Sequence, residues 1–81
     1  MRTFNDDEGR AWEAMAIPTK VAHLRDGARL GFRAGGADAD AAPYATTIEF
    51  NSMDAAAFAI GTMSEKELRR RLDLARTAAG A

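Results

Sequence analysis

Two helix starts lie close together in the stretch SMDAAAFAIGTMSEKE, and they divide the chain into two unlike parts. Ser52 and Ser64 are both favourable N-cap residues, and Ser64 opens the capping-box pattern S-E-K-E. Gly61 between them favours the end of a helix. The pattern therefore predicts a short helix over about residues 53–60 and a longer helix over residues 65–78.

The part before these helices shows the alternation of apolar and polar residues that is typical of short strands. Asp26-Gly27 predicts a two-residue hairpin turn that sets Val21 opposite Phe32. Pro18 is expected to end regular pairing, because proline lacks an N–H. The expected strands cover residues 2–4, 10–17, 20–25, 28–33 and 44–50, and residues 34–43 form a loop.

The fold class that follows is α+β. It comprises a small antiparallel sheet of four to five short strands, followed by a short and a longer C-terminal helix. A chain of 81 residues is expected to form a single small domain over residues 1–81.

The core of this domain is expected to be thin. The apolar fraction is 47%, but half of the apolar residues are alanine. Trp12 is expected to anchor the core rather than to serve as a platform for a ligand. The larger residues expected in the core are Phe4, Trp12, Ile17, Val21, Leu24, Leu30, Phe32, Ile48, Phe50, Phe58, Ile60, Leu68 and Leu72.

The composition excludes several classes of chemistry. The chain has no cysteine, so it has no disulfide framework, no thiolate nucleophile and no cysteine-ligated zinc. The start MRTFNDDEGR has no apolar run and does not resemble a signal peptide, and no stretch approaches the length of a membrane span. We therefore expect a cytoplasmic protein, which is peripheral on the cytoplasmic face if its partner is a membrane complex.

No constellation of residues predicts catalysis, a metal site or a cofactor. Ser52, His23 and Asp54 formally supply a hydroxyl, an imidazole and a carboxylate, but the serine and the aspartate have capping roles that explain them. His23 alone cannot form a zinc site, and we expect it to be partly buried. Asp6-Asp7-Glu8 lacks the downstream ligands of a calcium loop and is interpreted as a solvated turn. The chain is not expected to be an enzyme.

The segment after Ser52 has almost no polar face, which is unusual for a helix on the surface of a monomer. Either the segment is buried on both sides, or one side contacts a partner. The second alternative predicts a protein-interaction site formed by Met53, Phe58, Ile60 and Met63.

Basic residues gather on the predicted hairpin, where Lys20, Arg29 and Arg33 are expected to share the outer face. This face is a candidate contact for an anionic partner, such as an acidic protein patch, an anionic lipid headgroup or a nucleic acid. Arg69-Arg70-Arg71 is interpreted as a salt-bridged helix face, because two of these arginines follow a glutamate four residues earlier.

Both ends of the chain resemble a group of short, uncharacterised bacterial proteins of the Gemmatimonadota type. The opening MRTFNDDEGRAW is similar to their F-x-D-x-x-G-x-x-W start, and MSEKELRRRL is similar to their recurrent helix start, S-E/D-x-E-L. Some bacteria of this group are phototrophic, so the resemblance implies a peripheral subunit of a membrane complex such as a photosynthetic reaction centre. The resemblance transfers no activity and no functional residues.

The sequence thus predicts a non-catalytic interaction module, a small accessory subunit that docks on a larger assembly. A homodimer is compatible with the same apolar segment. The alternative is a small nucleic-acid-associated protein that uses the basic hairpin face.

Overall fold

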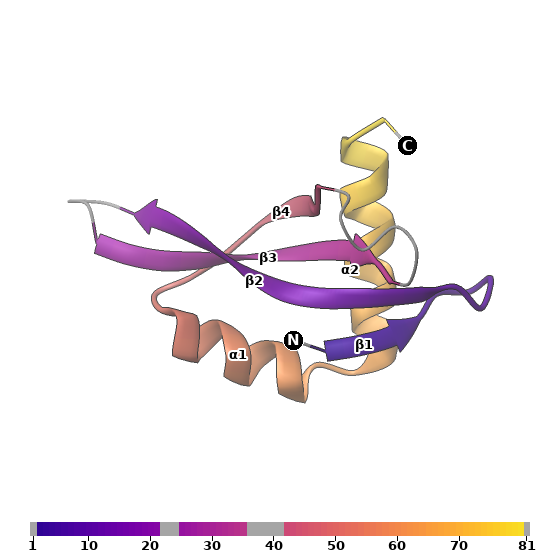
Figure 1. Cartoon of the computed structure of the whole chain (residues 1–81), viewed down its shortest axis with the longest axis horizontal. Coiled ribbons are helices and arrows are strands. Elements are labelled where there is room, and N and C mark those ends of the chain that lie inside the picture. The colour runs from indigo at the N-terminus through magenta and orange to yellow at the C-terminus, as the bar shows by residue number, and fades with distance from the viewer. Residues whose placement is uncertain (1, 22–24, 36–41, 81) are drawn as a thin grey trace.

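The computed structural model describes residues 2–21, 25–35 and 42–80 of the chain. The described part forms one antiparallel sheet with strand order β1-β2-β3-β4, followed by two helices (Figure 1). The elements are β1 (Arg2–Asn5), β2 (Ala11–Val21), β3 (Arg25–Ala34), β4 (Tyr44–Phe50), α1 (Met53–Thr62) and α2 (Glu65–Ala78). The predicted α+β fold is confirmed.

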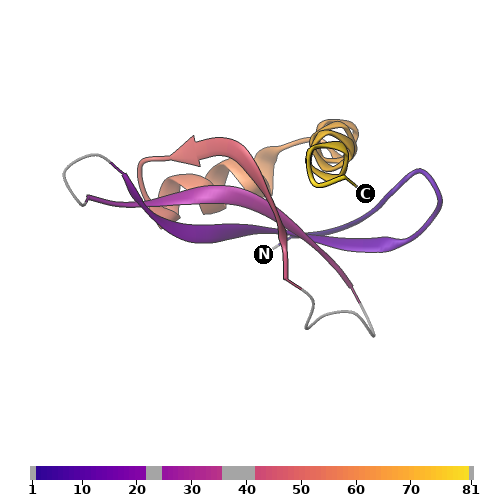
Figure 2. The same ribbon diagram turned by 90° about the horizontal axis from the view of Figure 1, so that it is seen from above.

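Both helices lie on the same side of the twisted sheet (Figure 2). Alternate residues of β2 and β3 point towards the helices, as the period of two requires. The core lies between the sheet and the helices. There, side chains of the sheet pack against Ile60 of α1 and against Leu68, Leu72 and Ala75 of α2.

Most of the predicted core residues are buried. The confirmed members are Phe4, Trp12, Leu30, Phe32, Ile60, Leu68 and Leu72, while Ile48 and Phe50 are half-buried against them. Four alanines are also buried, namely Ala14, Ala28, Ala56 and Ala75. Their small side chains allow the sheet and the helices to approach closely. Val21 and Leu24 are not among the residues whose side chains the structure describes.

Two predicted core residues lie elsewhere. The side chain of Phe58 is 74% exposed, so its placement in the core was wrong. Ile17 is half-buried and is separated from the core cluster. Its side chain lies over Gly31, where an added Cβ would collide with it. Gly31 thus provides the space that Ile17 fills.

The predicted hairpin register was wrong. Asp26 pairs with Lys20 and Gly27 with Thr19, so both residues lie inside β3 rather than in a two-residue turn. Residues 22–24, which connect β2 to β3, lie outside the described part. The observed register pairs β2 with β3 along almost their whole length, and this long ladder outweighs the local preference of Asp-Gly for a turn.

Pro18 does not end the pairing, contrary to the prediction. It lies within β2 opposite Ala28, so two expected strands are one long strand. β1 pairs with residues 11–14 of β2 and does not reach Pro18. Among the described residues, Pro18 therefore has a strand neighbour on one side, which is β3. Proline is tolerated at such an edge because its missing N–H removes no ladder hydrogen bond there.

The helix starts follow the predicted capping chemistry. The Ser52 hydroxyl accepts a hydrogen bond from the Ala55 N–H, and the Ser64 hydroxyl accepts one from the Glu67 N–H, both at 3.1 Å. α2 has the predicted bounds. α1 passes through Gly61 and ends at Thr62, so the expected stop at this glycine was too early.

Candidate functional site

The candidate site is the exposed outer surface of α1 around Phe58, to which Ala55 and Gly61 belong. Met53 and Ala57 are also exposed, but the helical period sets them nearer the side of Ala56 and Ile60. The opposite side of the helix is anchored by the buried Ala56 and Ile60. Since buried and exposed positions alternate with the helical period, the core contacts of α1 direct the outer surface towards solvent.

Arg2 holds the C-terminal end of α1 against the sheet. Its Nη1 donates to the carbonyl oxygens of Ile60 and Gly61, at 3.2 and 3.3 Å, and also to the carbonyl oxygen of Met63. A guanidinium at this position satisfies carbonyls that have no partner within the helix and complements the negative end of its dipole.

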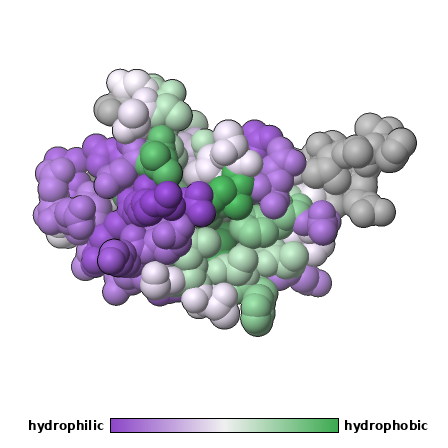
Figure 3. Space-filling view, turned by 180° about the vertical axis from the view of Figure 1, so that it is seen from behind, coloured by the Kyte–Doolittle hydropathy of each residue, from purple (hydrophilic) through white to green (hydrophobic). Residues whose placement is uncertain are grey.

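The four residues of the predicted interaction site do not share one surface. Phe58 is 74% exposed and Met53 is 45% exposed. Ile60 is buried in the core, and Met63 is half-buried and packs against it. Apolar surface gathers over α1 at the lower right of Figure 3, whereas hydrophilic surface dominates the left side. Of these four predicted site residues, only Met53 and Phe58 are therefore exposed enough for a partner to contact.

The arginines of the predicted anionic-partner site are paired within the chain. Arg29 Nη2 lies 2.6 Å from Glu49 Oε1, and Arg33 Nη2 lies 3.0 Å from Glu13 Oε2. These are cross-strand pairs, as the register sets Arg29 opposite Glu49 and Arg33 opposite Glu13. Lys20 occupies a described backbone position opposite Asp26, but its side chain lies outside what the structure describes.

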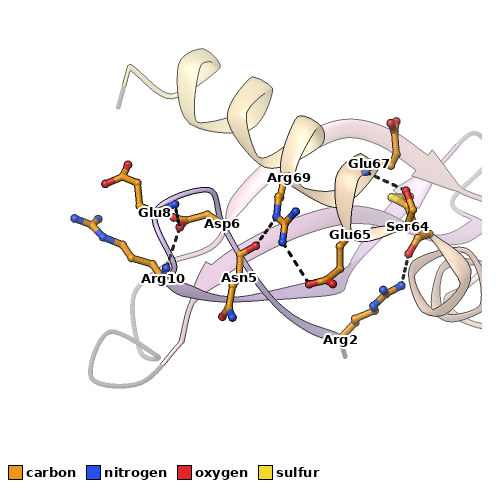
Figure 4. Close-up of polar contacts among 10 residues, drawn as sticks. Arg2, Asn5, Asp6, Glu8, Arg10, Ser64, Glu65, Glu67 and Arg69 are labelled. Carbon is orange, nitrogen blue, oxygen red and sulfur yellow. Dashed lines mark hydrogen bonds and ion pairs between the residues drawn. The ribbon is translucent and has the colours of Figure 1, made fainter.

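The three consecutive arginines of α2 are also paired, which confirms their interpretation as a salt-bridged face. Arg70 and Arg71 both contact Glu67 Oε1, at 3.2 and 2.8 Å. Arg69 lies 3.8 Å from Glu65 and donates from Nε to the Asn5 carbonyl at 2.8 Å (Figure 4). Arg69 thus also ties α2 to the end of β1.

Asp6 was interpreted as part of a solvated turn, but its side chain is buried. The carboxylate accepts hydrogen bonds from the Trp12 indole, the Arg10 N–H and the Glu8 N–H, at 2.8–2.9 Å (Figure 4 draws the two backbone contacts). Burial acts to raise the pKa of Asp6, but these hydrogen bonds and the Arg10 charge outweigh it and hold the pKa below its ordinary value. The bond to the N–H two residues on is an Asx turn, a signal that sequence reasoning missed.

A pocket of about 490 Å³ lies beside this turn, where β2 begins and β3 ends. Arg10, Trp12 and Tyr44 line it together with Arg76 of α2. The Trp12 and Tyr44 rings lie 6.0 Å apart, and the Arg76 guanidinium lies 5.4 Å from the Trp12 ring centroid. Sequence reasoning identified Trp12 as an anchor, which its burial confirms, but it did not predict this pocket.

In the described part of the chain, no group of three or more His, Cys, Asp or Glu side chains is placed to hold a metal ion. His23 lies outside the described residues, so its expected partial burial stays a prediction. None of the described helices is long and apolar enough to cross a membrane.

The comparisons with known proteins found no matching family model, no matching curated protein and no matching solved structure. The resemblance of the two chain ends to short Gemmatimonadota proteins therefore stays a prediction.

Proposed function

We propose that this protein is a non-catalytic interaction module, a small accessory subunit that binds a partner protein through the outer surface of α1. The single observation that carries the proposal is Phe58, a large apolar side chain that is 74% exposed. Asp54 in the first turn is the only charged residue of this helix. Depletion of charge around an aromatic residue is typical of the centre of a protein interface.

The fold itself does not require Phe58. Ala56 and Ile60 already provide the core contacts of α1, so Phe58 remains in water while the helix is fully packed. Covering such a side chain contributes about 1.5–3 kcal/mol. Ala55 and Gly61 beside it are small, and small side chains allow a partner element to approach closely.

The basic residues give weaker support for a partner contact. Arg29 and Arg33 are already paired with Glu49 and Glu13, so an acidic partner would compete with these carboxylates. The proposal therefore relies on apolar contact. The nucleic-acid alternative loses support for the same reason, because Arg69, Arg70 and Arg71 are paired as well.

The first test is affinity capture with the whole tagged chain from membrane and cytosolic fractions of the native host. Nuclease treatment and a high-salt wash remove partners held through nucleic acid or weak charge contacts. We expect one protein to be recovered in stoichiometric amount with the wild-type chain. Its source fraction shows whether the assembly is a membrane complex, the class that the resemblance suggests.

Phe58→Asp is the decisive variant, and Leu74→Asp is its matched control. Leu74 is a large apolar residue that is 54% exposed, but it lies on α2. We expect Phe58→Asp to weaken partner binding at least tenfold, since it removes about 1.5 kcal/mol or more of apolar contact. Leu74→Asp should retain the partner.

Circular dichroism of both variants must first show a folded chain. Equal recovery of the partner with Phe58→Asp would refute the role of α1. Recovery that disappears after nuclease treatment would favour the nucleic-acid alternative. Sedimentation of the purified chain shows whether the partner is a second copy of the protein.

A further inference from the structure

One pocket combines aromatic and basic residues, namely Arg10, Trp12, Tyr44 and Arg76. Its lining includes two aromatic residues and two arginines at a place where β2, β3, β4 and α2 come together. Its volume of about 490 Å³ is within the range of small-molecule sites. None of its lining residues belongs to α1, so it is separate from the proposed docking surface.

The aromatic side of the pocket is rigid. Trp12 is only 5% exposed, and its indole N–H donates to Asp6 Oδ2 at 2.9 Å. The Tyr44 ring is tilted by 45° to the indole, with a centroid separation of 6.0 Å. A ring fixed by burial and a hydrogen bond loses little conformational entropy when a ligand binds beside it.

The two arginines are held at the pocket by different contacts. Arg76 reaches from α2 over the Trp12 ring, 5.4 Å from its centroid, which is a cation–π contact. Arg10 is fixed through its backbone, since its N–H donates to Asp6 Oδ1 at 2.9 Å and its carbonyl accepts from the Asp6 N–H. Asp6 therefore positions both Trp12 and Arg10.

Arg10 and Arg76 also lack the carboxylate partner that most of the described arginines have, whereas Arg2 donates to backbone carbonyls instead. Within the described residues, Arg29, Arg33, Arg69, Arg70 and Arg71 each have a carboxylate within 4 Å. The same part of the chain supplies no ion pair to Arg10 or Arg76. A planar guanidinium forms two parallel hydrogen bonds with a carboxylate or a phosphate, which makes both groups suitable anion ligands.

We propose that this pocket binds a small ring-borne anion, a phosphate or a carboxylate attached to a flat ring. The anionic group lies between the guanidiniums of Arg10 and Arg76. The flat ring lies against Tyr44, because aromatic side chains offer a stacking surface to any planar group. The small residues Ala34, Gly35 and Ala42 leave the space that the ring occupies.

The test is a two-dimensional NMR titration of the whole chain with four probes. AMP carries a phosphate on a planar base, and benzoate carries a carboxylate on a ring. Adenosine supplies the ring without the anion, and inorganic phosphate supplies the anion without the ring. We expect saturable shifts of the Trp12 indole signal with AMP, benzoate or both, at concentrations at least tenfold lower than with either partial probe.

Arg76→Gln should raise the dissociation constant about tenfold or more, because it removes a charge-assisted pair of hydrogen bonds. Arg70→Gln is the matched control, since it changes net charge equally on an exposed face of the same helix. Arg10→Gln provides a second variant if loss of the Trp12 contact unfolds the chain.

Whichever of AMP and benzoate binds more tightly identifies the anion. The proposal fails if neither causes saturable shifts up to about 10 mM, or if inorganic phosphate alone binds as tightly. It also fails if Arg70→Gln weakens binding as much as Arg76→Gln, because the effect is then general charge attraction. Phe58→Asp should bind the probes normally, so this result is independent of the proposed function.

Discussion

Asp6 connects the turn after β1 to the start of β2 and to the wall of the pocket. Its carboxylate accepts hydrogen bonds from two backbone N–H groups and from the Trp12 indole, which an ionised carboxylate with about four acceptor sites can do at once. The adjacent Asp7 is exposed. Two neighbouring aspartates thus have different roles, one inside the structure and one in solvent.

Asp6→Asn should lower the thermal stability at neutral pH and flatten its dependence on pH. Folding lowers the pKa of Asp6, so the ionised carboxylate stabilises the folded state. This contribution to stability is complete above the unfolded pKa of about 4 and is lost as the pH falls through the lower pKa of the folded state. The melting temperatures of wild type and variant, measured from pH 7 to pH 2, should therefore converge below about pH 4.

Asp7→Asn is the control, because its side chain is exposed and takes no part in this network. A gap between wild type and Asp6→Asn that stayed constant from pH 7 to pH 2 would contradict the assigned role. The same variant should also disturb the NMR signal of the Trp12 indole, which Asp6 holds.

The two helices have different relations to the core. α2 buries Leu68, Leu72 and Ala75 along one stripe and carries paired charges on its exposed side. α1 buries only Ala56 and Ile60. α2 therefore buries two leucines along its stripe, whereas Ile60 is the one large side chain that α1 buries.

Ser64→Ala should destabilise the protein by about 0.5–2 kcal/mol, because it removes the acceptor for the Glu67 N–H at the start of α2. For a domain of this size each kcal/mol lowers the melting temperature by about 4–8 °C. Thermal unfolding followed by circular dichroism measures this shift. Thr77→Ala, at an exposed position near the other end of α2, should leave the melting temperature within about 2 °C.

The described part of the chain is held together by one small cluster of buried side chains between its two layers. For 81 residues the expected free energy of unfolding is about 4–12 kcal/mol. Loss of a single large core residue is therefore comparable with the total stability.

Leu72→Ala should lower the free energy of unfolding by about 2–5 kcal/mol, since Leu72 is fully buried and the space it leaves cannot fully collapse. Leu74→Ala is the matched control, on the same helix but 54% exposed, and should change it by less than about 1 kcal/mol. Urea denaturation measures both values. Similar losses for the two variants would contradict the packing of α2 on the sheet.

Parts of the fold and the candidate site were predictable because their causes are local. Ser52 and Ser64 mark the helix starts through hydrogen bonds that span three residues. Ile48 and Phe50 of β4 were correctly assigned to the core side of the sheet, since both pack half-buried against the core. Phe58 was recognised as a candidate contact residue, although it was also assigned to the core.

The remaining features depend on contacts between residues far apart in the chain. The register of β2 and β3 follows from the length of their ladder, which outweighed the local turn signal at Asp26-Gly27. Ile60 and Phe58 lie two positions apart, and only the packing of α1 on the sheet decides which one is buried. The pocket exists because α2 brings Arg76 to Trp12, sixty-four residues earlier.

By itself the sequence determined the class of fold and the helix starts, because short-range hydrogen bonds and periodicity encode them. Only the tertiary structure decided register, exposure and the pocket, because these arise where distant segments compete for the same small core.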